Sequence, residues 1–216
     1  MRSRLLRLGW APPLIGVLAA VTLIAAAPPS RAFVLQSLGH SLVVSDTIEH
    51  ADIAIMTTED ALGGALELAD LFRERVVDRV GYLVPGSSRS AGEMRSRGVR
   101  VTDSTDLLTA LGVPSNLIVP IAAGEGGTNE GSAGLAAWCT AHGIRRLIVV
   151  TSPDHSRRVR RTLARSFGTE RPTILIRSSR FSEFRPDTWW QSKTTLRTGL
   201  MELEHLVLDF VQHPLN

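Results

Sequence analysis

The sequence predicts a Rossmann-like α/β fold, a mostly parallel sheet with helices on both faces, preceded by an N-terminal hydrophobic segment. After residue 32, short apolar runs of strand length alternate with stretches of helical spacing. Glycine and proline turns separate many of these runs, as in chains built from βαβ units. With 216 residues and 44% apolar side chains, the chain is long enough for one such domain with a substantial core. We assign this domain to residues 33–216.

Residues 1–32 are predicted to be a signal peptide or a membrane anchor. Three arginines precede Leu14–Ala27, an uncharged apolar run of 14 residues. As a helix this run would span about 21 Å, less than the ~30 Å hydrocarbon core of a bilayer, which is typical of a signal peptide. Ser30–Ala32 resembles a cleavage site, whereas including Leu8–Ala11 makes a membrane anchor, so both alternatives stay open. The basic residues keep the N-terminus in the cytoplasm, which predicts that the body is exported.

The first half of the domain is expected to supply the following elements. Phe33–Val44 is a lead-in strand or a juxtamembrane segment, strands lie at Ala51–Met56, Arg79–Val84 and Val99–Thr102, and helices lie at Ala61–Arg75, Ala91–Arg97 and Ser104–Leu111. Leu62, Leu66 and Ala69 recur at the spacing of a helix face. The turn residues Pro85–Ser88 end the second of these strands, and Gly112 stops the last of these helices.

The second half continues the alternation of strand and helix. Strands are expected at Asn116–Ile121, Arg146–Thr151 and Thr173–Ile176, and helices from Thr128 or Asn129 to His142, at His155–Ser166 and at Lys193–Val211. Thr128 or Asn129 is a favourable N-cap, and Gly143 is a favourable residue after the helix end. Arg146–Thr151 is the most apolar of the strands.

The composition limits the chemistry. Without the four arginines of residues 1–31 the formal net charge falls from +3 to −1, which argues against a nucleic-acid-binding protein. Lys193 is the sole lysine, so arginine must supply the cationic groups; this suits bidentate binding of oxyanions and gives little room for Schiff-base catalysis. The single Cys139 excludes an intrachain disulfide and a cysteine-rich zinc cluster, and we expect it to pack in the core.

The carboxyl ends of parallel strands are where such sheets bind ligands. Four predicted loops meet there: Thr57–Asp60, Pro85–Arg89, Ala122–Glu130 and Thr151–Arg158. Glu59 or Asp60 could bind a metal or a ribose hydroxyl, or simply cap the following helix. Ser87 follows Pro-Gly and fits either a phosphate nest or a plain turn.

The loop Thr151–Arg158 carries the strongest functional signal. His155 and Arg158 are three residues apart and share the first turn of a helix, where free backbone N–H groups and the helix dipole attract anions. We expect Thr151, Ser152, His155 and Arg158 to bind a phosphate, carboxylate or nucleotide, with His155 available as a general acid. A capping or packing histidine beside solvated arginines is the alternative. Arg157, Arg160 and Arg161 fall on other faces and are expected to be solvated.

The loop before Thr128 carries the second signal. Its glycines, Gly126 among them, allow a ligand to approach the backbone, and Thr128, Asn129 and Glu130 then open a helix. Asn129 stands where a dinucleotide-binding G-x-G-x-x-G pattern needs its third glycine, which disfavours that function. Glu130 is a candidate acid/base partner of His155 or a capping residue. No metal-binding motif is present, and the residues do not specify a cofactor.

These motifs resemble those of a known family. The stretches LGHSLVVSDTIEHADIAIM, LLTALGVPSNLIV, GTNEGSAGLAAWCTAHGIRRLIVVTSPDHSRRVRRTLARSF and WWQSKTTLRTGLMELEHLVLDFV are similar to the YdcF-like domain of unknown function, the SanA/ElyC-like family of bacterial envelope proteins. VTSPDHSRR resembles the family's strand–Thr-Ser–x–x–His–x–x–Arg signature, and Thr128-Asn129-Glu130 its Thr–x–Glu–Asn helix start. Gly131 replaces the final Asn of that start, so the chain resembles a divergent member.

The resemblance implies a Rossmann-like domain behind a membrane segment, with a role in maintaining the bacterial cell envelope. It also implies a nucleotide-like ligand in some members. We therefore expect an envelope protein that binds a small anionic ligand, is exported across or anchored in the inner membrane by its N-terminal segment, and binds no nucleic acid. Two alternatives stay open: a hydrolase or transferase acting on a phosphorylated or sugar-linked envelope precursor, with His155 and Glu130 as acid/base, and a non-catalytic envelope assembly protein.

Overall fold

The computed structural model describes residues 28–84, 93–94, 96–98, 103–122, 128–167 and 172–214. Within these residues five strands form a single parallel sheet in the order β3-β2-β1-β4-β5. The strands are β1 (Ile53–Met56), β2 (Val80–Val84), β3 (Ile118–Ala122), β4 (Arg146–Thr151) and β5 (Thr173–Ser178). This arrangement confirms the predicted Rossmann-like α/β fold. Ser87, Gly126, residues 1–27 and the predicted strand Val99–Thr102 lie outside the described residues.

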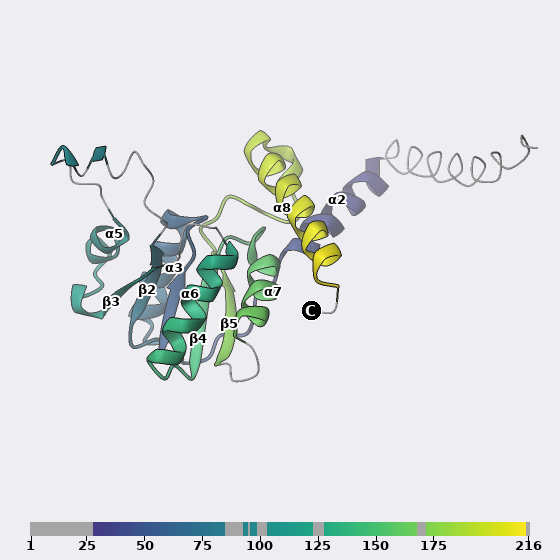
Figure 1. The fold of residues 1–216 in the computed structure, drawn as a ribbon. Helices are drawn as coiled ribbons and strands as arrows, with labels where there is room; N and C mark the ends of the chain where they lie inside the picture. The colour runs from purple at the N-terminus through teal and green to yellow at the C-terminus, as the bar shows by residue number, and fades with distance from the viewer. Residues whose placement is uncertain are drawn as a thin grey trace, which may run out of the picture.

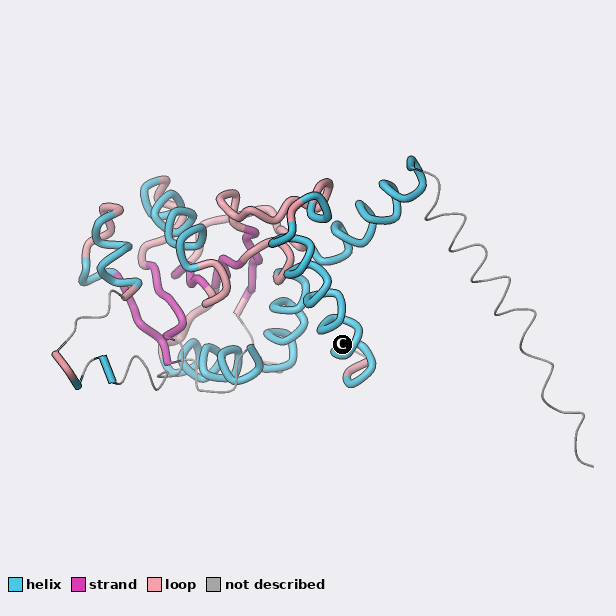
Figure 2. Tube along the Cα trace, turned by 90° about the horizontal axis from the view of Figure 1, so that it is seen from above, coloured by secondary structure: helices cyan, strands magenta, loops and turns pink. Residues whose placement is uncertain are grey.

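Helices cover both faces of the sheet, as Figures 1 and 2 show. On one face α3 (Ala61–Arg73) contacts α5 (Ser104–Ala110), and on the other α6 (Thr128–Ala141) contacts α7 (Ser156–Ser166). The central strand β1 alternates between the two layers: Ala54 and Met56 belong to the core under α3, and Ile53 and Ile55 to the core under α6 and α7. Because both faces of the strand are covered, all four of its residues are buried.

Two further helices lie beside the sheet. α2 (Pro28–Leu42) and α8 (Lys193–Gln212) contact each other and meet at the end of the molecule away from α5 (Figure 1). Trp189, in the short 3₁₀ helix η2 (Trp189–Gln191), is buried with Leu42, Phe184 and Leu206 and donates its indole N–H to the Leu35 carbonyl. Trp189 therefore packs α2 against α8. The other 3₁₀ helix, η1 (Ser115–Leu117), leads into β3.

The predicted lead-in strand at Phe33–Val44 is wrong, because this stretch is helical up to Leu42. The glycine in the middle of this stretch argues against a helix, but the packing of α2 requires a glycine at position 39. A Cβ at Gly39 would lie 2.4 Å from the Pro186 carbonyl oxygen, so only glycine lets α2 approach the loop before η2 this closely. Residue 32, where the predicted leader ends, falls inside α2.

The remaining described elements match their predicted positions to within a few residues, and the expected packing of Cys139 in the core is confirmed. Asp52 accepts hydrogen bonds from the backbone N–H groups of Arg145 and Arg146, at 2.7 and 2.9 Å, and so joins the amino ends of β1 and β4. Cys139 is buried in the core, where burial raises the pKa of its thiol to about 12. Within the described residues no helix combines the length and apolar character needed to cross a membrane.

Candidate functional site

The candidate site lies where the chain order of the sheet reverses, between the carboxyl ends of β1 and β4. β2 and β3 extend the sheet on one side of this pair, and β5 on the other. Such a reversal opens a crevice that α/β proteins use for ligands. The two strand ends are joined directly, because the Thr57 hydroxyl donates to the Thr151 hydroxyl at 3.0 Å. Thr151 and Ser152 are both buried at this edge.

His155 is held rigidly in the turn after β4. It is the N-cap residue of α7, and it is only 1% exposed. The next residue, Ser156, fixes the turn: its hydroxyl donates to the Pro153 carbonyl at 2.7 Å and accepts from the Val44 backbone N–H at 2.7 Å. The imidazole therefore has little freedom to rotate away from its neighbours.

Two carboxylates flank the His155 ring. Nδ1 lies 3.1 Å from a Glu202 oxygen of α8, and Nε2 lies 3.1 Å from a Glu59 oxygen in the turn after β1. The contact to Glu59 has an ion-pair distance without the geometry of a hydrogen bond, so the buried Nε2 has no hydrogen-bond partner. The Glu59 side chain is 31% exposed, against 13% for Glu202. Glu59 is thus the member of the trio that faces solvent.

Arg158 joins the trio to a third helix. Its guanidinium donates to both oxygens of Glu202, at 2.8 and 2.9 Å, and to the Thr128 hydroxyl at 3.0 Å. Such a bidentate, charge-assisted pair is both strong and well oriented. One side chain therefore connects α7 with the start of α6 and with α8. We call Glu59, Thr128, His155, Arg158 and Glu202 the His155 cluster.

The protonation state of His155 follows from its neighbours. Nδ1 also lies 2.8 Å from an Arg158 nitrogen, a contact that would suit a neutral ring accepting a hydrogen bond from the guanidinium N–H. With a carboxylate at each ring nitrogen, however, the charged ring is favoured, and Glu202 bridges the two cations. Burial alone would lower the pKa of His155, but the Glu202 and Glu59 carboxylates outweigh it and raise this pKa to about 9.

The two carboxylates respond in the opposite direction. Burial would raise the pKa of Glu59, but His155 outweighs this effect and holds that pKa at about 2. Burial likewise opposes ionisation of Glu202, and His155 and Arg158 together lower its pKa to about 2. At neutral pH the cluster therefore contains two cations and two anions. Its charges balance, so it does not attract anions as two free cations would.

This balance changes the hypothesis drawn from the sequence. The position between His155 and Arg158 that was expected to hold a ligand's phosphate or carboxylate is taken by the carboxylate of Glu202. The predicted neighbourhood itself is present, because Arg158 reaches Thr128 across the edge. Glu130, the expected acid/base partner, lies exposed in the first turn of α6. Among the described residues, the carboxylates within ion-pair distance of His155 belong to Glu59 and Glu202 instead.

The other residues singled out in the sequence take separate places. Asn129 and Arg158 line a pocket of about 220 Å³ between α6, α7 and α8. Asp60 caps α3 by accepting the Gly63 N–H at 3.0 Å, so Asp60 is structural while Glu59 joins the cluster. Ser87 and Gly126 lie outside the described residues, as stated above.

The expected solvation of Arg157, Arg160 and Arg161 is wrong. Arg161 is buried and binds Asp209, with its guanidinium over the Phe210 ring at 3.8 Å. Arg160 binds Asp46, and Arg157 donates to the Ser41 and Val43 carbonyls. These three arginines find partners within the protein because α8 and the end of α2 with the segment after it pack on the faces of α7 that carry them.

Glu202 is the residue that sequence reasoning missed. A signal for it exists, because Thr195, Gly199, Glu202, Leu206 and Asp209 follow the periodicity of one helix face. Acidic residues on the buried face of a helix require cationic partners. The arginine-rich helix α7 supplies them.

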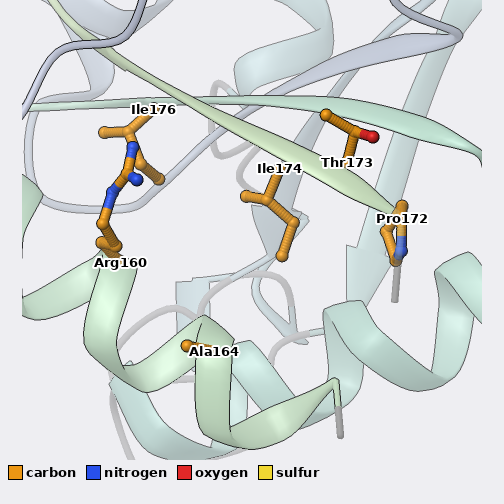
Figure 3. A pocket seen from close by; sticks show the side chains of 6 residues that line it. All are labelled: Arg160, Ala164, Pro172, Thr173, Ile174 and Ile176. Carbon is orange, nitrogen blue, oxygen red and sulfur yellow. The ribbon is translucent and has the colours of Figure 1, made fainter. Parts of the chain in front are cut away.

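A second pocket, of about 460 Å³, lies beside β5 (Figure 3). It is lined by Arg160, Ala164, Pro172, Thr173, Ile174 and Ile176. Its charged residue, Arg160, is already paired with Asp46. The pocket also follows β5 from its first residue, away from the carboxyl ends of the strands, so we do not assign it to the candidate site. The described residues hold no group of three or more His, Cys, Asp and Glu side chains arranged to bind a metal.

Fold and site together define a Rossmann-like α/β domain with a cluster of charged side chains at the carboxyl ends of its strands. No protein-family model matches the chain. No curated protein matches it either. Among solved structures, it is similar to the reductase domain of an aureusimine biosynthetic cluster, with 15% sequence identity and a TM-score of 0.25 over 59% of this chain. The match covers 41% of that domain, and a likeness at this level carries no functional argument.

Proposed function

We propose that this chain is a cell-envelope protein, a divergent relative of the YdcF-like family, that binds a small phosphorylated or nucleotide-like ligand at the carboxyl edge of its sheet. The observation that carries the proposal is the buried His155 side chain, whose Nε2 lies 3.1 Å from the partly exposed Glu59 carboxylate at the reversal point of the sheet. Groups whose pKa values are strongly shifted by burial and by specific charged partners are candidates for functional sites.

The cluster favours a ligand with hydroxyl groups as well as negative charge. His155 keeps Glu59 ionised, and an ionised carboxylate is an acceptor for the hydroxyls of ribose or another sugar. The negative part of the ligand would lie toward Thr128 and Asn129, where the first backbone N–H groups of α6 are not used within the helix. A ligand of this kind would span the two sides of the edge.

The envelope location is proposed on sequence evidence. It is supported by the arginines ahead of the apolar run Leu14–Ala27 and by the resemblance of VTSPDHSRR to the family signature. Cleavage of the leader and anchoring by it are equally compatible with the proposal, because the site lies in residues 57–202.

An enzymatic role is the second candidate. It is favoured by the row Glu59–His155–Glu202, in which one carboxylate holds the imidazole and the other faces outward, as in catalytic arrangements that orient a histidine. With its pKa near 9, His155 is charged at neutral pH and would act chiefly by stabilising negative charge, while Glu59 would contact the substrate. Phosphoester or glycosidic chemistry is the class that this arrangement suits.

A thermal-shift screen of the full-length chain in detergent tests the proposal. The probes are adenosine and uridine mono- and diphosphates, hexose 1-phosphates and inorganic phosphate. We expect at least one nucleotide or sugar phosphate to raise the melting temperature, and Glu59→Gln to abolish that rise. Glu74→Gln, an exposed carboxylate at the far end of α3, is the matched control and should leave it unchanged.

The same variants separate binding from catalysis. Turnover of a bound phosphoester that is lost in Glu59→Gln would establish the enzymatic role. Binding without turnover leaves the ligand-binding proposal in place. If none of the probes shifts the melting temperature of the wild-type chain, the proposed site does not bind this class of ligand.

A further inference from the structure

Exposed apolar side chains are concentrated on α2 and α8. Of the 14 large hydrophobic residues that the described part of the chain exposes, nine lie on these two helices. They are Phe33, Val34 and Leu38 on α2, and Leu200, Met201, Val207, Leu208, Phe210 and Val211 on α8. Single exposed hydrophobics are ordinary, but a concentration of this kind marks an interaction surface.

α8 is apolar on both of its sides. Gly199, Leu206 and the other buried residues of one face pack against the protein. Leu200, Val207 and Val211 follow one another at intervals of seven and four residues on an opposite face, with exposures of 53, 60 and 74%, and the exposed Glu204 lies on the same face. Intervals of this length place the three side chains on one stripe of a helix. This second stripe does not pack in the protein core.

α2 and α8 form a single unit rather than two loose helices. A Cβ at Gly39 of α2 would lie 2.7 Å from the Trp189 ring, and a Cβ at Gly199 of α8 would lie 2.5 Å from the same ring. Both helices therefore close on one buried indole, which fixes their relative position. They lie together at one end of the molecule, and α5 lies at the other (Figure 1).

The chain itself indicates what covers this unit. The apolar run Leu14–Ala27 ends at the residue before α2 begins at Pro28. If that run enters a bilayer, α2 starts at the bilayer surface, and α8 is held beside it. Phe33, 70% exposed, lies one and a half turns into α2, and Arg31, Lys193 and Arg197 are exposed on the first turns of the two helices. Apolar side chains flanked by basic ones are the pattern of helices that lie in the membrane interface.

We propose that the exposed faces of α2 and α8 rest on the surface of a phospholipid bilayer, with Val207 and Val211 among the acyl chains near the headgroups. The inference takes only the envelope location from the proposed function and is independent of the ligand site. It assigns α8 two roles: one face completes the His155 cluster through Glu202, and the other face contacts lipid.

Lipid quenching of a site-specific probe tests the contact. An environment-sensitive fluorophore is attached at Val207→Cys in the full-length chain with Cys139→Ala, reconstituted in phosphatidylglycerol/phosphatidylcholine vesicles with or without brominated acyl chains. We expect blue-shifted emission that brominated lipid quenches at least twofold. Thr109→Cys on α5, exposed at the other end of the molecule, is the matched control and should show neither effect.

Each other outcome overturns the inference in a recognisable way. Emission that stays unshifted in a vesicle-bound chain means that α8 faces water. Emission that is shifted but not quenched, together with a doubled mass in detergent, means that a second copy of the chain covers the face. A full-length chain that does not associate with vesicles overturns the envelope location as well. The thermal shift by nucleotides or sugar phosphates is a separate measurement, and none of these results affects it.

Discussion

Two charged clusters follow one another along the contact between α7 and α8, and they differ in composition and in exposure to solvent. In the His155 cluster, Glu202 pairs with a histidine and an arginine and lies beside a carboxylate that reaches solvent. Seven residues further along α8, Asp209 pairs with Arg161 and Arg165, both largely buried. The second cluster contains no group that titrates near neutral pH, and Phe210 covers Arg161.

The comparison shows that buried charge alone does not identify a functional site. Both clusters fasten α8 to α7, but only the His155 cluster lies at the carboxyl ends of the strands and includes a buried ring nitrogen without a hydrogen-bond partner. We therefore treat the Asp209 cluster as structural and propose a functional role for the His155 cluster alone. The predictions below separate these roles.

The largest effect is expected from Asp209→Ala. It removes the carboxylate shared by Arg161 and Arg165, and loss of one partner of a buried pair costs about 3–5 kcal/mol. For a domain of this size the melting temperature should fall by roughly 10 °C, measured by calorimetry, while the shift produced by a bound ligand stays unchanged. Glu204→Ala, an exposed acid on the same helix, is the control. A loss below about 1 kcal/mol would show that the Asp209 cluster is screened by solvent.

Glu202→Ala should cost about 3 kcal/mol for the same reason, but with a different consequence. It empties the space between His155 and Arg158, so the Arg158 guanidinium loses its counter-ion and is left to attract an anion. Sulfate should then stabilise the variant far more than the wild type, by roughly 2.7 kcal/mol at a hundredfold excess over its Kd. Denaturant unfolding across a sulfate series measures this gain. Equal sulfate effects in both proteins would contradict the view that Glu202 occupies an anion position.

The pH dependence of stability should also distinguish the clusters. His155 has a folded pKa of about 9 against 6.5 for a free histidine side chain, so its contribution to stability is complete below pH 6.5 and is lost as the pH rises through 9. Glu59 and Glu202 have folded pKa values of about 2 against 4.5, so their contribution is complete above pH 4.5 and is lost as the pH falls through 2. Stability should therefore be greatest between these limits.

The loss on the alkaline side should be on the order of 3 kcal/mol, counted once because the three groups share the same interactions. Urea unfolding between pH 5.5 and 9.5 measures it. His155→Gln should remove most of this slope, and Asp209→Ala should not. A slope that persists in His155→Gln would place its origin elsewhere in the chain.

The smallest effect on stability is expected from Glu59→Gln. The side chain is partly exposed, and Glu202 still pairs with His155 when Glu59 is replaced, so the cost should be smaller than that of Glu202→Ala. Its effect on ligand binding should nevertheless be the largest of the four variants. A large destabilisation without loss of ligand binding would reverse the roles that we assign to Glu59 and Glu202.

The fold was predictable from the sequence because its strands carry their signals locally. Arg146–Thr151, for example, was predicted with the bounds that the structure shows, since a fully buried strand is a short apolar run. α2 was missed because the close approach that requires Gly39 depends on Pro186 and Trp189, far along the chain.

The site was predictable only in part. The sequence predicted that His155, Arg158 and Thr128 lie close together, because all three follow strands and stand at helix starts. The topology of a parallel sheet brings such positions to one edge. The place of Glu202 in the site could not be predicted, because its partners lie on another helix and no spacing in the sequence links them to it. For the same reason the sequence could not show that the anion position was already filled.

The central claim is that His155 is held as a buried imidazolium between Glu59 and Glu202. NMR titration of the His155 ring in the wild-type chain, assigned by comparison with His155→Gln, tests it most directly. The account predicts a pKa of about 9, falling markedly in Glu202→Ala. A pKa at or below 6.5 would mean that the ring is neutral at physiological pH, and the charge balance on which the proposed site rests would not exist.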